Sequence, residues 1–389
     1  MDSAATLAAA ETMTSSLLSD LETLVNIDSG TYIPAGVAQV ADELRPRFEA
    51  LGCAVEMVPG SSDLGPQMIA RRSGQGRARV ALIGHMDTVF PDGEAQRRPF
   101  ELRDGRAYGP GVFDMKGGLL VGLYALRLLS EAGEAPYSEL TFLCNSDEEI
   151  GSPTSRSLVA QIARSADAVL VLEPSADVER LTTARKGVGM YRLDVQGRSA
   201  HAGVEPRRGR NAILELAYRI LSLHALNGEI EGVTVNVGVV SGGERPNVVA
   251  EHAHALIDVR ATDQAGLTAI EDALRQVAAE APHVPDTQVS LSGRFEHQPF
   301  PQNEQTMRLF ALAEAEGQAL GLTLQSAATG GASDGNTAAG LGIPTLDGLG
   351  PAGGLAHNPG EYVVVESFPL RIALLAGLLR RIDAANPVD

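Results

Sequence analysis

Histidines and acids gather in five short stretches of this 389-residue chain. The stretches are GHMDTVF (84–90), GPGVFDMKGG (109–118), NSDEEIGS (145–152), VLEPS (171–175) and AHNPGEY (356–362). The side chains of interest in them are His85, Asp87, Asp114, Glu148, Glu149, Glu173 and His357. Five carboxylates in a cleft of low dielectric would repel one another strongly, and divalent cations relieve that repulsion. Because the ligands are imidazole and carboxylate, with no cysteine among them, the set suits a hydrolytic Zn²⁺ or a related first-row metal.

Hydrolysis of an amide needs an activated water, a polarised carbonyl and a proton carrier. Two metals about 3.5–4 Å apart supply the first two, and a carboxylate that bridges them fixes their separation. A free carboxylate beside them supplies the third. The adjacent pair Glu148 and Glu149 fits a division of labour between one metal ligand and one base.

Apolar runs typical of buried strands precede four of the five stretches. These runs are VALI (80–83), ELTFLC (139–144), AVLVL (168–172) and IPTLDGLG (343–350). Helical periodicity at 12–26, 36–51 and 116–133 alternates with them, which indicates an α/β domain whose mainly parallel sheet is covered on both faces. Such sheets bind ligands where the carboxyl ends of their strands meet. We therefore expect the acids and histidines to converge at that edge.

The pattern changes near residue 182. Further along, the sequence predicts strands and helices in the order β-α-β-β-α-β, at 188–197, 211–226, 233–243, 253–261, 265–281 and 288–295. This order is that of the split βαβ, ferredoxin-like unit. We predict a catalytic domain at 1–183 and 295–389 that is interrupted by an inserted domain at 184–294. A helix at 305–320, a strand at 323–328 and a helix at 367–382 are expected to complete the catalytic sheet.

Composition excludes several classes of partner. A net charge of −18 without a basic stripe argues against nucleic acid. No stretch of about 18 uncharged apolar residues occurs, so we expect no membrane span. The N-terminal residues lack the basic segment of a signal peptide. Cys53 and Cys144 are far apart and outside any CxxC pattern, so reduced thiols in a cytoplasmic enzyme are expected.

The motifs GHMDTV, YGPGVFDMKGG, DEEIGS and LEPS, in this order and spacing, resemble those of the family M20 metallopeptidases. The chain is most similar to the glutamate carboxypeptidase (carboxypeptidase G2-like) branch, near the acetylornithine deacetylases and succinyl-diaminopimelate desuccinylases. The resemblance extends from TLVNIDSGT (23–31) to EYV (361–363). It implies a di-zinc exopeptidase-like catalytic domain with an inserted ferredoxin-like lid and dimerisation domain. Two Zn²⁺ per subunit are expected, with Co²⁺ or Mn²⁺ as alternatives.

The resemblance also implies how the metal ligands are shared. Asp114 would bridge the two metals. His85 and Glu173 would complete one site, and Glu149 and His357 would complete the other.

Three further roles follow from the same resemblance. Glu148 would be the general base and acid, and Asp87 would hydrogen-bond His85 and orient its ring. The peptide bond between Asp114 and Met115 would be cis. His201, in GRSAHAG (197–203), would reach the active site of the partner subunit in a homodimer and stabilise the oxyanion. A locally hydrogen-bonded strand-end histidine is the alternative for this residue.

Seven residues are predicted to contact the substrate or to line its cleft. RPNVVA (245–250) resembles the family's NxxP-type segment, and this resemblance makes Asn247 a candidate oxyanion or substrate contact. Arg260 and Arg294 are candidates to bind a substrate carboxylate, because a guanidinium binds carboxylates in a bidentate manner. For Arg294 a solvated surface arginine is the alternative. The segment GGASDGN (330–336) resembles the family's GG-(S/T)-D segment, which implies that Gly331, Ser333, Asp334 and Gly335 line the cleft, where small residues allow backbone groups to approach a substrate closely.

The function predicted from the sequence is hydrolysis of the amide bond to a C-terminal amino acid. Folate-like and N-acyl-glutamate substrates are the leading expectation, within a broader class of small peptides and N-acyl-amino acids. One alternative keeps the same machinery but acts as an N-acyl-amino-acid deacylase or a dipeptidase. The alternative of another class is a non-catalytic M20-like binding protein.

Overall fold

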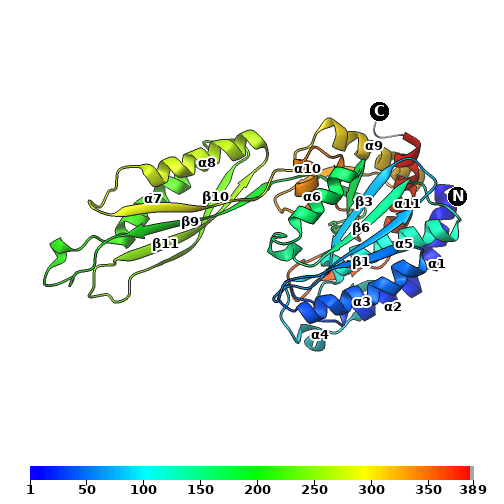
Figure 1. Cartoon of the computed structure of the whole chain (residues 1–389), viewed down its shortest axis with the longest axis horizontal. Helices are drawn as coiled ribbons and strands as arrows, with labels where there is room; N and C mark the ends of the chain where they lie inside the picture. The colour runs from blue at the N-terminus through cyan, green and yellow to red at the C-terminus, as the bar shows by residue number, and fades with distance from the viewer. Residues whose placement is uncertain (386–389) are drawn as a thin grey trace. The chain divides into compact units, whose positions relative to one another are not determined.

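The computed structural model describes residues 1–385, which form two compact units (Figure 1). Unit 1 comprises Met1–Ala184, Gln302–Ala328 and the chain from Ser333 onward, and unit 2 comprises Arg185–Pro301 with Thr329–Ala332. The predicted insert ended at residue 294, whereas unit 2 continues to Pro301. The reason is that Arg185 and Phe300 exchange two backbone hydrogen bonds of 2.9 Å, which tie the start of unit 2 to its end.

Unit 1 is built on a six-stranded sheet with the strand order β1-β2-β6-β3-β7-β14. The strands are β1 (Ala54–Val58), β2 (Gln67–Ser73), β3 (Arg79–His85), β6 (Glu139–Asn145), β7 (Ala168–Val171) and β14 (Thr345–Leu346). β6, β3, β7 and β14 run parallel to one another, and β2 pairs antiparallel with both β1 and β6. The predicted α/β class with a mainly parallel sheet is confirmed.

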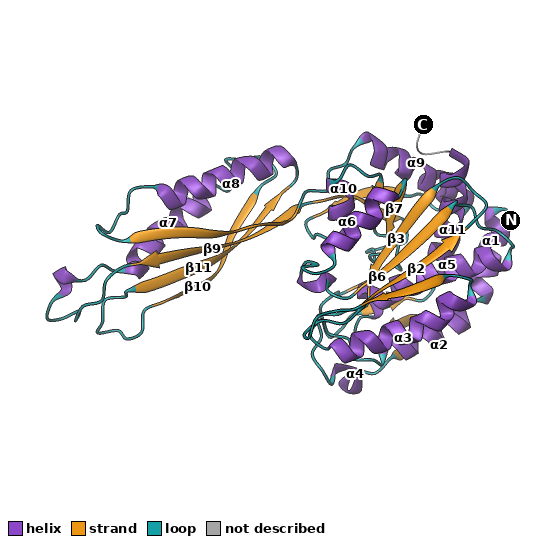
Figure 2. Cartoon of the chain, viewed as in Figure 1, coloured by secondary structure: helices purple, strands orange, loops and turns teal. Residues whose placement is uncertain are grey.

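Helices cover both faces of this sheet (Figure 2). Leu82 and Phe142 face the larger core, and their strand neighbours Ile83 and Leu143 face the smaller one, as the two-residue period of a strand requires. The larger core contains residues of α1 (Ser3–Thr12), α2 (Thr14–Val25), α3 (Pro34–Ala50), α5 (Gly117–Glu131), α9 (Glu304–Ala319) and α11 (Ser367–Ala385). The smaller core contains residues of α6 (Arg156–Ser165) and α10 (Asp334–Gly340). The short α4 (Glu94–Arg97) lies between β3 and β4 in the chain.

Two small sheets complete unit 1. The prediction that residues 323–328 join the catalytic sheet is wrong, because β13 (Gln325–Thr329) pairs instead with β8 (Arg180–Arg185) in a sheet of two strands. A four-stranded sheet combines segments that flank two of the motifs: β4 (Glu101–Arg103), β5 (Arg106–Tyr108), β15 (Gly353–Gly354) and β16 (Tyr362–Val364). Because β5 pairs with β16, the segment that precedes Asp114 in the chain lies beside the segment that follows His357.

Unit 2 has the predicted β-α-β-β-α-β order and the ferredoxin-like strand arrangement β10-β11-β9-β12, antiparallel throughout. Its elements are β9 (Gly187–Gln196), α7 (Ala212–Ala225), β10 (Thr234–Gly242), β11 (His252–Ala261), α8 (Gln264–Ala279) and β12 (Gln288–His297). Alternate residues of β9 and β11, such as Leu193 and Ile257, pack with Leu216 of α7 and Ile270 of α8. Among residues 1–385, no helix combines the length and apolar character needed to cross a bilayer.

Candidate metal centre

The carboxyl ends of the parallel strands bring the predicted residues together. β3 ends at His85, which is in register with Asn145 at the end of β6. A short 3-10 turn, Glu148–Ile150, follows β6 and carries Glu148 and Glu149. Glu173 lies two residues beyond the end of β7. Since neighbouring parallel strands end at the same edge of a sheet, all of these side chains face one site.

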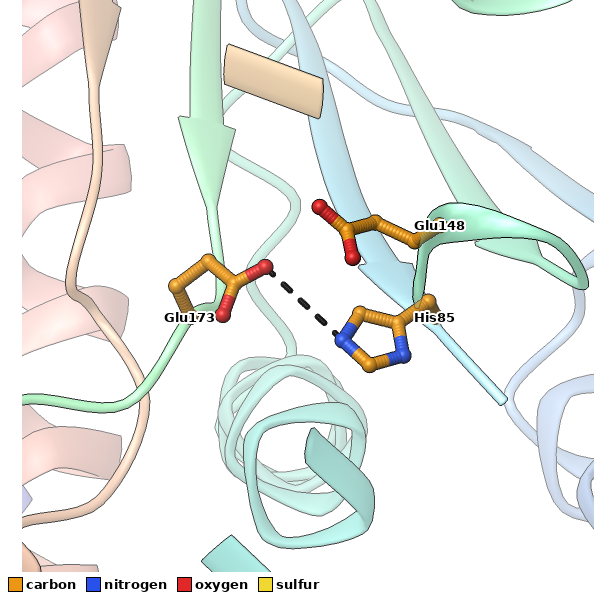
Figure 3. Close-up of side chains that lie close together, drawn as sticks. All are labelled: His85, Glu148 and Glu173. Atoms are coloured by element: carbon orange, nitrogen blue, oxygen red, sulfur yellow. Dashed lines mark ion pairs between the residues drawn. The ribbon is translucent and has the colours of Figure 1, made fainter. Parts of the chain in front are cut away.

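Asp114 lies between two histidines. Its Oδ1 is 3.1 Å from His85 Nε2 and its Oδ2 is 3.2 Å from His357 Nε2. His357 Nε2 is also 3.0 Å from Glu149 Oε2, and His85 Nε2 is 3.8 Å from Glu173 Oε1 (Figure 3). A carboxylate whose two oxygens each face a separate imidazole has the arrangement required of a bridging ligand. The peptide bond between Asp114 and Met115 is cis, as predicted.

Burial and mutual repulsion shape the charges of this cluster. Burial, followed by the charge of Glu173, raises the pKa of Glu148 well above its usual value. Hydrogen bonding to Asp114 and then to Glu149 raises the pKa of His357 to about 10. Burial lowers the pKa of His85, but the carboxylates of Asp114 and Asp87 outweigh it and leave that pKa well above the usual value. In the absence of a metal cation, protons bound to these groups reduce the repulsion between the carboxylates.

The residues present fit a pair of divalent cations. Glu149 Oε1 is buried and has no hydrogen-bond partner within residues 1–385, so one oxygen of a buried carboxylate still needs a positive partner. Ligand atoms of His85, Asp114 and Glu149 lie within 4.8 Å of one another, as do those of His85, Glu148 and Glu173. The donor set of imidazole nitrogens and carboxylate oxygens is the one that zinc and related metals prefer.

Metal uptake by chelator-stripped protein is expected to release protons. Near pH 7 the raised pKa of His357, about 10, means that its ring is protonated in the metal-free state and must lose that proton to bind a metal. The apparent metal affinity should consequently increase as the pH rises from 6 toward 9. Calorimetry of Zn²⁺ binding in buffers of different ionisation enthalpy measures the proton count. Binding without proton release would contradict this account.

Asp87 contacts both His85 and the turn that carries Glu148 and Glu149. His85 Nδ1 lies 2.9 Å from the backbone carbonyl oxygen of Asp87 and 3.5 Å from its carboxylate. The carboxylate accepts the backbone N–H groups of Glu148 and Glu149, each at 3.2 Å, and the hydroxyl of Thr31 at 2.7 Å. Asp87 is fully buried and thus connects the first metal-binding motif to the turn that carries the proposed base.

Glu361 is a site residue that the sequence interpretation did not identify. Its buried carboxylate accepts the backbone N–H groups of Gly111, Phe113 and Asp114 at 3.1, 2.8 and 2.9 Å. Burial raises its pKa to about 7, although the three backbone bonds act in the opposite direction. The carboxylate fixes the loop on which Asp114 is presented. Its position inside AHNPGEY, four residues after His357, was the signal that could have found it.

Two more buried acids hold the loop between β6 and α6. Asp147 accepts the backbone N–H and the hydroxyl of Thr154, both at 2.7 Å, and also the hydroxyl of Ser155. Asp334 accepts from Asn145 Nδ2 at 2.6 Å and from Ser152 Oγ at 2.5 Å. These acids fix the loop that contains Glu148 and Glu149.

Four predicted substrate contacts and His201 lie in unit 2. His201 is exposed, and its Nδ1 accepts the backbone N–H groups of Gly203 and Val204. The loops of His201 and Asn247 are joined by a bond from Ala202 N to Asn247 O. Arg260 forms an ion pair with Asp258 and donates a hydrogen bond to the carbonyl oxygen of Gly330. Arg294 is exposed. The carbonyl oxygen of Gly331 accepts a hydrogen bond from Arg185.

Ser333 lies in unit 1 and is fully buried. It is the N-cap of α10, where its hydroxyl accepts from Gly335 N and donates to Asp347 at 2.6 Å. Its side chain is thus occupied by helix capping, which leaves backbone groups as the means by which this segment could contact a substrate.

The chain is similar to known proteins over most of its length. The profile of Peptidase family M20/M25/M40 matches residues 81–381. Carboxypeptidase G2 from a Pseudomonas species is 31% identical over 374 residues, 95% of this chain and 90% of that protein. Acetylornithine deacetylase from Myxococcus xanthus is 32% identical over 251 residues, 60% of this chain and 63% of that enzyme. A tripeptidase from Staphylococcus aureus shares the fold, with a TM-score of 0.81 at 24% identity over 95% of this chain and 99% of the other. The chain is therefore a hydrolase of peptidase family M20/M25/M40, a family of metallopeptidases and related amidohydrolases.

Proposed function

We propose that this metallopeptidase is a carboxypeptidase that releases a C-terminal amino acid, with glutamate as the leading candidate, from an acyl, peptidyl or pteroyl-type group. The observation that supports this most is the position of Asp114, whose two carboxylate oxygens lie 3.1 and 3.2 Å from His85 and His357, with the separate carboxylate of Glu148 in the same cluster. The choice of substrate is supported by the similarity to carboxypeptidase G2, which extends over 95% of the chain.

Two Zn²⁺ are the proposed metals, with Co²⁺ or Mn²⁺ as alternatives. His85, Asp114 and Glu173 would hold one, and Asp114, Glu149 and His357 the other. When bound, the metals would polarise the scissile carbonyl and make water more acidic. Glu148 accepts a proton as the water oxygen attacks the carbonyl carbon, and it returns that proton to the nitrogen when the C–N bond breaks.

Unit 2 would supply substrate contacts. His201 would donate a hydrogen bond to the oxyanion in the active site of the partner subunit, with Asn247 assisting. Arg260 and Arg294 would bind carboxylates of the substrate. Exposure of His201 and Arg294 supports this, because their side chains are accessible to another molecule.

A homodimer through unit 2 is the proposed assembly. Exposed apolar side chains concentrate on α7 and β10: Ile213, Leu214, Tyr218 and Leu221 on the helix, and Val239 and Val240 on the strand. β10 is an edge strand of its sheet, so its outer backbone groups are free to pair with another strand. An apolar helix side next to an open strand edge favours a second copy of the same surface.

Substitution of this surface is expected to give a monomer. Leu221 is 69% exposed and Val240 is 54% exposed, so Leu221→Glu with Val240→Lys should leave folding intact while placing charges in the proposed interface. Light scattering measures the mass. Leu102→Glu is the matched control, because Leu102 is 52% exposed on β4 of unit 1. A double variant with the wild-type mass would reject the interface, and a monomeric wild-type protein would also remove the trans role of His201.

Hydrolysis assays with and without added Zn²⁺ test the proposed function. Chelator-stripped protein would be assayed against folate, N-acyl-glutamates, N-acetyl-ornithine and N-acyl neutral amino acids. Zinc-restored release of glutamate is the expected result. Activity confined to the other acyl-amino acids would assign the chain to the deacylase alternative, which the acetylornithine deacetylase similarity favours. Absence of hydrolysis across the panel with metal bound would reject the substrate class.

A further inference from the structure

Helix α11 directs one fully buried arginine toward the segment that follows Glu173. Arg371 Nη2 donates to the backbone carbonyl oxygens of Asp177 at 3.0 Å and Arg180 at 2.9 Å. Its Nε and Nη1 are buried and lack a hydrogen-bond partner in the described part of the chain. Burial lowers the pKa of Arg371 to about 10, so the side chain is still a cation at neutral pH. A buried cation with unfilled donors is costly, and the catalytic steps proposed above do not use it.

The two carbonyls bonded by Arg371 belong to a turn that begins two residues after Glu173. Ser175 Oγ donates to the Arg180 carbonyl at 3.0 Å, so this oxygen accepts from both Ser175 and Arg371. Pro174, with its fixed φ, separates Ser175 from Glu173. The hydrogen bonds that fix the turn 175–180 therefore also restrict the backbone at Glu173, just after the end of β7.

The first residue of the same helix holds the segment that leads to His357. Ser367 Oγ accepts the Ala352 N–H at 3.0 Å and donates to the Val364 carbonyl at 2.6 Å.

The segment at 350–353 is in turn bonded to the Glu173 segment. Gly350 N donates to Glu173 O at 2.9 Å, Ser175 N donates to Pro351 O at 3.1 Å, and Gly353 N donates to Ser175 O at 3.1 Å. The first two turns of α11 thus connect the backbone segments that carry one proposed ligand of each metal.

We propose that Arg371 is a positioning residue for the metal pair. From α11 it fixes the turn 175–180 and, together with Ser367, sets the separation between the segments of Glu173 and His357. Arg371 contacts neither the metals nor the substrate in this role. The inference rests on the proposed metal ligands and is independent of the proposed substrate, so a failed glutamate assay leaves it intact.

Direct measurement of Zn²⁺ binding tests the role of Arg371. Arg371→Met removes the donors at similar length, and Arg371→Lys keeps the charge on a shorter side chain. Competition with a chromophoric chelator gives the Zn²⁺ stoichiometry and dissociation constants, and thermal unfolding of the metal-free proteins gives their stability. Arg371→Met is expected to weaken Zn²⁺ binding by about 10- to 100-fold, the effect typical of residues that hold metal ligands in place, and Arg371→Lys by less.

Arg381→Met is the matched control on the same helix. Arg381 pairs with Glu316 at 2.7 Å, so its loss should lower stability without changing Zn²⁺ affinity. Wild-type Zn²⁺ affinity in Arg371→Met, or an equal loss of affinity in Arg381→Met, would assign Arg371 a purely structural role and overturn the proposal. If Arg371→Met does not fold, Arg371→Lys and Ser367→Ala decide. Both should bind Zn²⁺ more weakly than the wild type, and wild-type affinity in both would also overturn it.

Discussion

Replacement of Glu148 by glutamine is expected to lower kcat by about 10²- to 10⁴-fold, the usual contribution of general acid–base catalysis. Glutamine preserves the shape of the side chain but cannot accept a proton from water or return one to the leaving amine. KM and the bound metal should change little, because Glu148 is assigned no metal. Steady-state kinetics with metal analysis of the same preparation would measure all three quantities.

The metal content of Glu148→Gln separates two roles that the geometry allows. Glu148 has ligand atoms near those of His85 and Glu173, so it could also serve as a metal ligand. Loss of one metal in the variant would show that Glu148 is a ligand, and the assignment of the proton carrier would then have to change. Glu304→Gln is a matched control, because Glu304 also lies in unit 1 but its exposed side chain pairs with Arg308, outside the metal cluster.

Replacement of Asp114 by asparagine is expected to disrupt the metal pair. An amide presents one oxygen and no net charge, whereas Asp114 presents an oxygen to each histidine, at 3.1 and 3.2 Å. We expect weaker binding of both metals and a loss of activity of roughly 10³-fold or more, since metals stabilise the transition state by several kcal/mol. Metal titration and kinetics would measure these effects.

A control for this variant is available on the surface. Asp104 is exposed and has a φ of +52°, a conformation that asparagine tolerates, so Asp104→Asn should retain metal and activity. Two metals bound at wild-type affinity in Asp114→Asn would show that this residue is not the bridge.

The sequence predicted that these histidines and acids lie together, because local apolar runs mark the strands at whose ends they lie. Each apolar run specifies a buried strand, and the parallel order of β6, β3 and β7 then places His85, Glu148 and Glu173 at one edge. His357 could not be placed in this way, because it follows a strand of two residues and lies in a loop where its own φ is +62°. Its role came from the family resemblance alone.

Apart from Asp87, the residues that hold the proposed ligands in place were not identified in that role from the sequence. Asp147, Asp334 and Glu361 act through backbone N–H groups and neighbouring polar side chains, and these interactions leave no periodic signal in the chain. An isolated acid beside a turn is equally typical of a helix cap. Their roles depend on contacts between segments as far apart as Asn145 and Asp334, which only the folded structure brings together.

Two elements show the limits of pattern recognition in the fold. Helix α1 was not predicted, because its alanine-rich sequence has no distinct apolar face even though Asp2 caps it. β13 was assigned to the wrong sheet, because a strand of five residues with few buried side chains carries no information about its partner. Periodicity identifies an element, but the choice of neighbour depends on the remainder of the chain.

The insertion of unit 2 into unit 1 has a consequence for biosynthesis. During translation the ribosome first synthesises the part of the chain that contains His85, Asp114, Glu148, Glu149 and Glu173. It then synthesises all of Arg185–Pro301, and only afterwards His357 and α11. The main segment of unit 2 is contiguous and can fold while the nascent chain is still growing, whereas the sheet of unit 1 is complete only after its edge strand β14 has been synthesised. Five clustered acids and histidines would thus remain without their last partner until translation is nearly finished. A chain that terminates early would carry most of the metal-binding groups but no assembled catalytic centre.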